Sequence, residues 1–248
     1  MPDGEKKTDT ILLHSCCAPC SSYCLLYLTR SQRVTVFYDN PNITDRLEYE
    51  KRVAEQIRLI EIYNRYAKEV AVNMPKSGEG GCDIGLKERL LGEMESLNSE
   101  RFQKHPDLAE WIAQQLAFPR YEIGFEKGPY EPERFWQIAQ GLEDSPERGP
   151  RCHKCYRLRL EDTAKAAAGF DLFATTLTLS PLKDAKAINR IGCEIASQYE
   201  TAYLETDFKK NNGYLISILL SELFGLYRQN YCGCEFSKNN TVKAADGS

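Results

Sequence analysis

The alternation of short apolar runs with longer helical patterns is the feature that most restricts the fold of this 248-residue chain. Residues 10–14 and 34–38 are apolar runs of strand length, and a segment with helical signals follows each of them. Pro19 suits the first turn of a helix that extends to about residue 28. Because strands that alternate with helices build parallel sheets, the sequence predicts an α/β fold with helices on both faces of a parallel sheet.

Further elements are expected along most of the chain. The pattern predicts helices over residues 44–66, 132–140, 152–168, 184–198 and 214–224, and strands over residues 70–72, 171–176 and 202–205. Within the first of these helices, Leu47, Val53, Ile57 and Ile60 follow helical spacing. Residues 73–120 are mostly polar helical pieces, which indicates an insertion. We expect one catalytic domain over residues 1–238, and a disordered polar tail over residues 239–248.

Charge and hydropathy narrow the choice of compartment and partner. The net charge of −4 gives no overall attraction to nucleic acid, so any such partner would need a local basic patch. No apolar run is long enough to span a bilayer, and the first residues lack the apolar core of a signal peptide. The sequence therefore predicts a cytoplasmic protein without a membrane partner.

The chain contains ten cysteines, and their spacing separates them into two kinds. A chain of this size folds on its own core, and in a reducing compartment clustered cysteines bind metal or exchange electrons. Cys24, Cys82 and Cys193 are isolated, and we expect them to be small core residues. The other seven form three tight groups.

The first group, Cys16, Cys17 and Cys20, lies where the first strand meets the first helix. In open α/β sheets, ligands bind at the carboxyl ends of the strands, where helix N-termini also point. A helix N-terminus lowers the pKa of a thiol, and the thiolate is the form that binds metal. This position and spacing predict a metal or redox site.

The two other groups leave several chemistries open. Cys152 and Cys155 form a C-x-x-C at a helix start, which is typical of a redox pair, half of a zinc site or two ligands of an iron–sulfur cluster. Together with the first group, this pair supplies four ligands for zinc or for a 4Fe–4S cluster. Cys232 and Cys234 flank Gly233, whose freedom in φ lets both sulfurs face one centre. They are either an easily reduced disulfide or two ligands of an additional metal.

Residues around the cysteine groups suggest partners. Basic and aromatic side chains that could hold phosphates and stack on a base flank these groups: Arg151, Lys154, Arg157, Arg159, Lys183, Lys209, Lys210, Tyr227 and Arg228. His14 adjoins the first group, either as a donor to it or as an ordinary hydrogen-bonded strand residue. Neither a G-x-G-x-x-G nor a Walker motif occurs, so a nucleotide cofactor is not predicted.

Four segments occur in an order that makes the pattern specific, at residues 14–21, 152–159, 176–183 and 227–236. Together they resemble the cobalamin-independent epoxyqueuosine reductase family, QueH. This resemblance implies a Rossmann-like fold of the adenine nucleotide α-hydrolase type. It also implies the last step of tRNA queuosine biosynthesis, the reduction of epoxyqueuosine to queuosine at the anticodon wobble position of tRNA, with electrons from a donor that the sequence does not identify.

The same resemblance assigns roles to the cysteines. It implies a 4Fe–4S cluster whose ligands carry over onto Cys16, Cys17, Cys152 and Cys155. Cys232 and Cys234 become the redox-active pair, and Cys20 is available to share a second, mononuclear iron with them. The chain departs from the family pattern in the insertion at about residues 73–120 and at Asp39, where an aromatic residue is expected.

Two alternative functions remain at this point. One is another cluster-dependent tRNA-modifying enzyme that thiolates its base. The lack of a phosphate-binding loop counts against it, because such thiolation needs ATP. The other is a zinc-stabilised RNA-binding module without catalytic activity.

Overall fold

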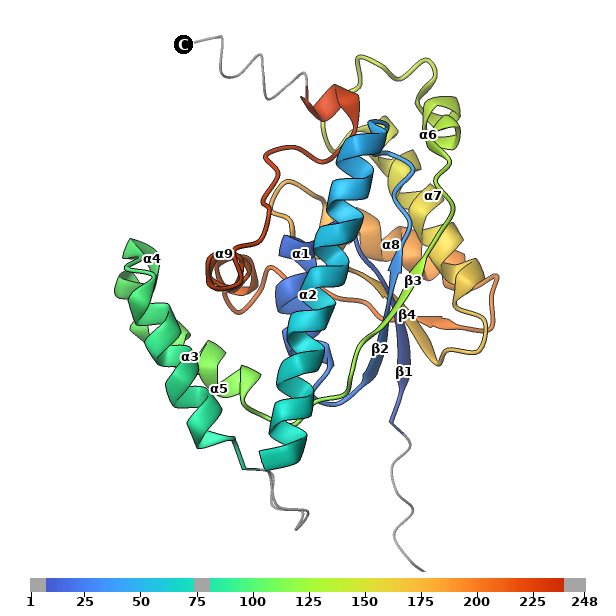
Figure 1. Ribbon diagram of the computed structural model, residues 1–248. Helices are drawn as coiled ribbons and strands as arrows, with labels where there is room; N and C mark the ends of the chain where they lie inside the picture. Colours follow the sequence, from blue (N-terminus) through green and yellow to red (C-terminus); the bar gives the residue numbers. More distant parts are fainter. Residues whose placement is uncertain (1–7, 74–80, 239–248) are drawn as a thin grey trace, which may run out of the picture.

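A computed structural model of the chain describes residues 8–73 and 81–238 (Figure 1). Its centre is a five-stranded sheet with the strand order β3-β2-β1-β4-β5. All neighbouring strands are parallel. The strands are β1 (Thr10–His14), β2 (Arg33–Tyr38), β3 (Gly124–Lys127), β4 (Leu172–Thr175) and β5 (Ala202–Tyr203). The predicted α/β class with a parallel sheet is confirmed.

Helices cover both faces of this sheet (Figure 1). One face carries α1 (Ala18–Leu28), α2 (Arg46–Asn73) and α9 (Gly213–Leu223), and the other carries α7 (Pro150–Ala166) and α8 (Ala185–Ala196). The short helix α6 (Pro132–Ala139) packs against α7. Three further helices, α3 (Ile84–Ser96), α4 (Glu100–Lys104) and α5 (Pro106–Leu116), lie beyond the first face and fall within the expected insertion. No helix in residues 8–73 and 81–238 is long and apolar enough to cross a membrane.

Alternating residues of β1 divide the core into two layers. Ile11 and Leu13 pack into the cluster that contains the buried residues of α1, α2 and α9, whereas Leu12 packs with residues of α7 and α8. This follows from the two-residue period of a strand, which sends successive side chains to opposite faces. All three leucine and isoleucine side chains are fully buried, as expected for a central parallel strand.

The strand order creates a crevice between β1 and β4. The chain winds outward from β1 through β2 to β3, and then crosses to the other side of β1 with β4 and β5. Ligands of doubly wound sheets bind at such a reversal, outside the carboxyl ends of the strands. Here β1 leads directly into Cys16 and Cys17, and β4 leads into a 3₁₀ helix over Thr176–Leu179.

Two elements differ from the sequence-based expectation. The strand predicted over residues 70–72 is wrong, because α2 continues to Asn73. Val70 is buried on the same helical face as Tyr66 and Ala67, while Val72 is 83% exposed, so packing overrides the preference of valine for strands. The edge strand β3 was not expected, since Gly124–Lys127 contains a glycine and two charged residues.

The buried face of α2 is more polar than the apolar spacing suggests. Leu47 is 80% exposed and Ile57 is 37% exposed, although both belong to the expected apolar face. The helix instead buries Arg52, Gln56 and Tyr63, together with several apolar residues. These polar side chains support the backbone of the cysteine segments, as described below. The expected disordered tail lies outside the described residues.

Candidate functional site

The first cysteine group forms a compact trio at the end of β1. Cys17 is the N-cap of α1, and Pro19 occupies its first turn, as expected. The sulfur atoms of Cys16, Cys17 and Cys20 all lie within 4.8 Å of one another, and those of Cys16 and Cys17 are 3.8 Å apart. The trio therefore offers three soft ligands to one centre, which is the donor type that zinc and iron–sulfur clusters prefer.

The backbone of the trio is fixed by α2. The hydroxyls of Ser15 and Ser21 both donate to Oε1 of Gln56, at 2.7 and 2.9 Å. All three residues are fully buried, so these bonds are shielded from water. Gln56 thus holds the turn between β1 and α1, which carries the trio.

Hydrogen bonds concentrate negative charge on one sulfur of the trio. Hydrogen bonds from Cys17 and Cys20 hold the pKa of Cys16 well below its usual range, with help from the charges of Lys183 and Arg159. The same interaction with Cys16 raises the pKa of Cys17 to about 12. Among the three thiols, Cys16 is therefore the one whose pKa is lowered, which favours the form that binds metal.

Cys152 and Cys155 lie in the first turns of α7, whose N-cap is Gly149. Burial raises the pKa of Cys155 to about 11, and the charge of Arg159, one turn further on, opposes this effect. Cys155 packs against Phe135 and Cys234, while Cys152 packs against the cluster that contains Cys16 and Cys17. The C-x-x-C segment therefore packs with Cys234 on one side and with the core cluster that contains Cys16 and Cys17 on the other.

The C-x-C segment lies in the part of the chain that follows α9. In Figure 1 this red segment runs from α9 to the amino-terminal end of α2, and its Phe236 packs against Phe135 of α6. Gly233 adopts φ +109°, so the predicted use of its conformational freedom is confirmed. The carbonyl oxygen of Cys232 lies 3.4 Å from donor nitrogens of both Asn42 and Arg52, and the Cys232 N–H donates to the Ser237 hydroxyl at 3.1 Å.

All ten cysteines are free thiols in this structure. Cys232 and Cys234 therefore do not form the disulfide that one reading of the C-x-C sequence suggests. Cys24 is fully buried, as expected, and Cys82 is partly buried against the core. The prediction of a core position for Cys193 is wrong, because this residue lies on the exposed face of α8.

The three groups line two neighbouring cavities. One cavity has a volume of about 20 Å³, and its lining includes Cys152, Cys155, Cys232 and Cys234. The other has a volume of about 190 Å³, and its lining includes Cys16, Cys17, Cys20 and Cys232. Cys232, Lys183 and Glu147 line both cavities. The fold thus gathers all seven grouped thiols at the crevice between β1 and β4, with Cys232 shared by the two cavities.

A buried polar network lies beneath the thiols. His14 is hydrogen-bonded to the Thr175 hydroxyl at 2.8 Å and to the carbonyl oxygen of Asp39 at 3.1 Å. Burial and the charge of Arg159 lower the pKa of His14 to about 3, so its ring is neutral. The guanidinium of Arg159 also donates to the side-chain oxygen of Asn40. His14 is therefore a structural residue that links the ends of β1 and β4.

Three of the nine residues expected on a basic and aromatic surface are buried, namely Arg151, Arg159 and Lys183. Arg159 is 1% exposed, and Arg151 is buried with its guanidinium donating to the carbonyl oxygens of Leu142 and Glu143. These two side chains cannot hold phosphates, because their charges are needed inside the protein. Arg157 pairs with Glu194. Among the basic residues considered, Arg228 is both exposed and part of the 190 Å³ cavity.

Several site residues were not identified from the sequence. The amide of Cys16 donates to the Thr176 hydroxyl at 3.2 Å, and that hydroxyl lies 3.5 Å from the Cys16 sulfur. Arg52 and Gln56 support the cysteine segments from α2, where they resemble ordinary polar helix residues. Thr176 belongs to one of the four segments that resemble the known family, so that segment was the available signal for it.

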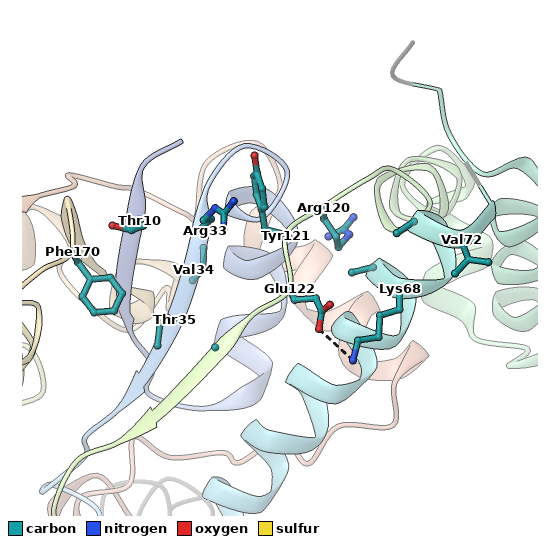
Figure 2. Close-up of a pocket in the computed structure, with 13 residues that line it drawn as sticks. Thr10, Arg33, Val34, Thr35, Lys68, Val72, Arg120, Tyr121, Glu122 and Phe170 are labelled. Carbon is teal, nitrogen blue, oxygen red and sulfur yellow. Dashed lines mark ion pairs between the residues drawn. The ribbon is translucent and has the colours of Figure 1, made fainter. Parts of the chain in front are cut away.

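A larger hollow of about 840 Å³ lies at the opposite end of the sheet (Figure 2). Figure 2 shows Thr10, Arg33 and Tyr121 around it, and the ion pair of Lys68 with Glu122 at 3.3 Å on one wall. No cysteine lines this hollow. It faces the amino ends of the strands, away from the thiols, and we do not assign the chemistry to it.

The fold and the site define an α/β protein of the class that uses clustered cysteine thiolates for metal binding or electron transfer. A family model described as "Epoxyqueuosine reductase QueH" matches residues 11–76 and 98–240. The chain therefore belongs to the epoxyqueuosine reductase QueH family, and it is an oxidoreductase. The resemblance inferred from the four sequence segments is confirmed. The unmatched residues 77–97 fall inside the expected insertion.

Individual relatives agree with this family over most of the chain. An epoxyqueuosine reductase QueH of Staphylococcus epidermidis is 34% identical over 239 residues, covering 95% of this chain and 78% of the relative. One from Streptococcus pyogenes serotype M1 is 33% identical, covering 95% of this chain and 72% of the relative. One from Thermotoga maritima is 29% identical, covering 92% and 90%.

Proposed function

We propose that this chain reduces epoxyqueuosine to queuosine at the anticodon wobble position of tRNA, in the cytoplasm, as the last step of tRNA queuosine biosynthesis. The observation that carries the proposal is the gathering of seven thiols around two cavities that share Cys232. The catalytic unit is a single α/β domain over residues 1–238, with an insertion at about residues 73–120. Neither thiolation nor a purely structural zinc site has comparable support.

The cofactor of this reaction is a 4Fe–4S cluster held by Cys16, Cys17, Cys152 and Cys155. The donor set fits, because all four ligands are thiols and Cys152 packs against the same buried cluster as Cys16 and Cys17. When bound, the cluster supplies electrons one at a time from an external donor. The low pKa of Cys16 supports early thiolate binding at that ligand.

Cys232 and Cys234 are the redox-active pair, and Cys20 completes their set. Cys232 lies between the two cavities, next to Cys152 and Cys155 on one side and Cys20 on the other. This placement suits a dithiol that is oxidised during turnover, or a second, mononuclear iron held with Cys20 beside the substrate. Both versions use the same three thiols.

The 190 Å³ cavity is where the modified base enters. The smaller cavity has room for only a water-sized group. The wall and rim of the larger one include Leu182, which is 54% exposed, and Tyr214, which is 39% exposed. These side chains offer stacking surface to an extruded base, while Arg228 offers a charge to a phosphate. The substrate is therefore placed close to Cys20 and Cys232.

The test combines cofactor analysis with turnover. Anaerobically purified protein should be brown and contain iron and sulfide in near-equal amounts, whereas a zinc protein would be colourless. With a low-potential reductant, it should convert epoxyqueuosine in tRNA to queuosine, a loss of one oxygen by mass after nuclease digestion. A protein that carries the cluster but leaves this nucleoside unchanged would refute the proposal.

A further inference from the structure

Lys183 occupies the point where the two thiol-lined cavities meet. It follows the 3₁₀ helix after β4 and precedes α8, so it lies at the carboxyl end of a central strand. The residue is only 8% exposed, yet it contributes to the lining of both cavities. Such a position places a basic side chain in the lining that the two groups of thiols share.

Hydrogen bonds fix the backbone from which this side chain extends. The Lys183 N–H donates to the carbonyl oxygen of Ser180 at 3.1 Å, and Lys209 Nζ donates to the Lys183 carbonyl oxygen at 3.2 Å. Arg148 donates to the carbonyl oxygens of Leu182 and Pro181, at 3.1 and 2.6 Å. The loop is thus held on both sides, which fixes the backbone from which the Lys183 side chain extends.

The side chain of Lys183 is buried beside thiols that the proposed function assigns to the metal and redox centres. No carboxylate forms an ion pair with Lys183 within residues 8–73 and 81–238. Lys183 is therefore a buried base without an ion-pair partner among the described residues, in the lining that the two cavities share with Cys232 and Glu147.

The other buried cationic side chains near the thiols already have hydrogen-bond or ion-pair partners. Arg159 donates to Asn40 and lies against His14, and Arg52 forms an ion pair with Glu48 at 2.7 Å. Arg151 is bound to two carbonyl oxygens of its own loop. Of the buried basic residues around this site in the described part of the chain, Lys183 alone lines both cavities.

We propose that Lys183 is a catalytic residue whose ammonium group binds the epoxide oxygen and stabilises the negative charge that forms there when the C–O bond breaks. This inference rests on the proposed function and assigns a role that the thiols cannot perform. Thiolates and a reduced cluster are negative or electron-rich, so they would repel a developing oxyanion. A buried, preorganised hydrogen-bond donor stabilises such a charge far more than water does.

The overall step is balanced without loss of the lysine proton. Two electrons, delivered in turn by a low-potential one-electron donor, and two protons from solvent convert the epoxide to an alkene and water. Both C–O bonds break, and the second bond of the C=C forms. Lys183 supplies a fixed positive charge throughout, which pairs with the oxygen until it is protonated and leaves.

The test compares Lys183→Met, Lys183→Arg and the control Lys186→Met, which changes an exposed lysine at the start of α8. We expect Lys183→Met to keep its iron and sulfide and its affinity for tRNA, while kcat falls by about 10²–10³-fold, as for loss of one oxyanion donor. Lys183→Arg should recover at least about tenfold of this loss, since it keeps the charge. Lys186→Met should retain wild-type kcat.

A binding measurement provides a second readout that does not depend on turnover. Without reductant, the wild type should bind an anticodon stem-loop with epoxyqueuosine more tightly than one with queuosine, and Lys183→Met should lose this preference. Unchanged kcat in Lys183→Met would overturn the proposal. Loss of iron from both Lys183 variants would also overturn the proposal, because the lysine would then be structural. A raised KM with unchanged kcat in Lys183→Met would overturn it as well.

These outcomes are distinguishable from failure of the proposed function. If wild-type protein with an intact, reducible cluster does not convert epoxyqueuosine, then the function is wrong and the lysine role falls with it. If the wild type converts epoxyqueuosine and Lys183→Met does so equally fast, then only the role of Lys183 is wrong.

Discussion

Gly233 lies directly against Arg52. A side-chain carbon at Gly233 would come within 3.0 Å of Arg52 Nη1 and 2.8 Å of Ile43 Cγ1, and the residue adopts φ +109°. Glycine is therefore needed for two separate reasons, the backbone conformation and the lack of space. This contact fixes the distance between the C-x-C segment and α2, and therefore also the positions of the Cys232 and Cys234 sulfurs.

Replacing Gly233 by Ala should displace that segment. We expect a loss of about 1–3 kcal/mol in the free energy of unfolding, from strain at positive φ together with the close contacts. Turnover should fall at least about tenfold, because a displacement on the order of 1 Å at a reacting group has effects of this size or larger. Urea unfolding and initial rates measure the two effects.

Gly169→Ala is the matched control for Gly233→Ala. Gly169 adopts φ +89°, and a side-chain carbon there would meet nothing within 4 Å. It lies between α7 and β4, at the end of the sheet opposite the thiols. This variant should lose stability through strain alone and keep full activity per folded molecule. Equal loss of activity in both variants would show that positioning of the C-x-C segment is not the cause.

The second prediction concerns the cluster ligands. Cys152→Ala and Cys155→Ala should each abolish the visible cluster absorption and lower the iron content, because one iron then lacks its thiolate. Cys24→Ala and Cys193→Ala should keep wild-type iron and sulfide, since one residue is buried in the core and the other lies exposed on α8. Full iron and sulfide in both of the first two variants would remove this pair from the ligand set.

The sequence predicted the fold well where apolar periodicity was strong. The first two strands, α1 and the helices after residue 130 lie close to the expected positions. It failed where local preference and packing disagree, as at Val70, whose side chain a helix buries. It also failed at Gly124–Lys127, a short edge strand that takes its conformation from pairing with β2. Such pairing between distant residues leaves no local pattern in the sequence.

Prediction of the site stopped at the cysteines. Their spacing showed which cysteines form groups along the chain, but only the fold shows that Cys232 lies between the two cavities. The basic residues illustrate the opposite error. Arg159 and Lys183 look like surface charges in the sequence, yet both are buried. Arg159 lies against His14 and Asn40, and Lys183 lines the two cavities. Composition alone cannot reveal such burial.

A third prediction concerns pH and Asp39, the residue that departs from the family pattern. Burial, reinforced by the neighbouring Asp162, raises the pKa of Asp39 from 3.8 to about 7. As the pH rises from about 4 to 7, the unfolded carboxyl ionises while the folded one stays protonated. The free energy of unfolding therefore falls across this range. The stabilisation that the protonated Asp39 carboxyl provides below pH 4 is lost above pH 7.

Asp39→Asn should remove this dependence, because the amide stays uncharged across this pH range. We expect the variant to be more stable than the wild type at pH 8, by about 2 kcal/mol, and to show a flatter profile between pH 4 and 7. Asp144→Asn, at an exposed position, should leave the profile unchanged. Urea unfolding at several pH values tests this, and identical slopes for wild type and Asp39→Asn would contradict it.

The last prediction separates cluster assembly from turnover. Cys16, Cys17, Cys152 and Cys155 already complete the ligand set of a 4Fe–4S cluster, so Cys232 and Cys234 should be dispensable for assembly. The double variant Cys232→Ser, Cys234→Ser should keep a cluster that dithionite reduces, yet fail to convert epoxyqueuosine in tRNA.

Both halves of that result are measurable on one sample. Iron, sulfide and the visible spectrum report assembly, and the mass of nucleosides from digested tRNA reports turnover. Wild-type conversion by the double variant would exclude the C-x-C pair from the mechanism. Loss of the whole cluster would instead make Cys232 and Cys234 ligands, a result compatible with the cavity that they share with Cys152 and Cys155, and would release two of the four thiols assigned above. Because Cys232 also lines the cavity of Cys20, the released thiols would then be sought in the trio at the end of β1.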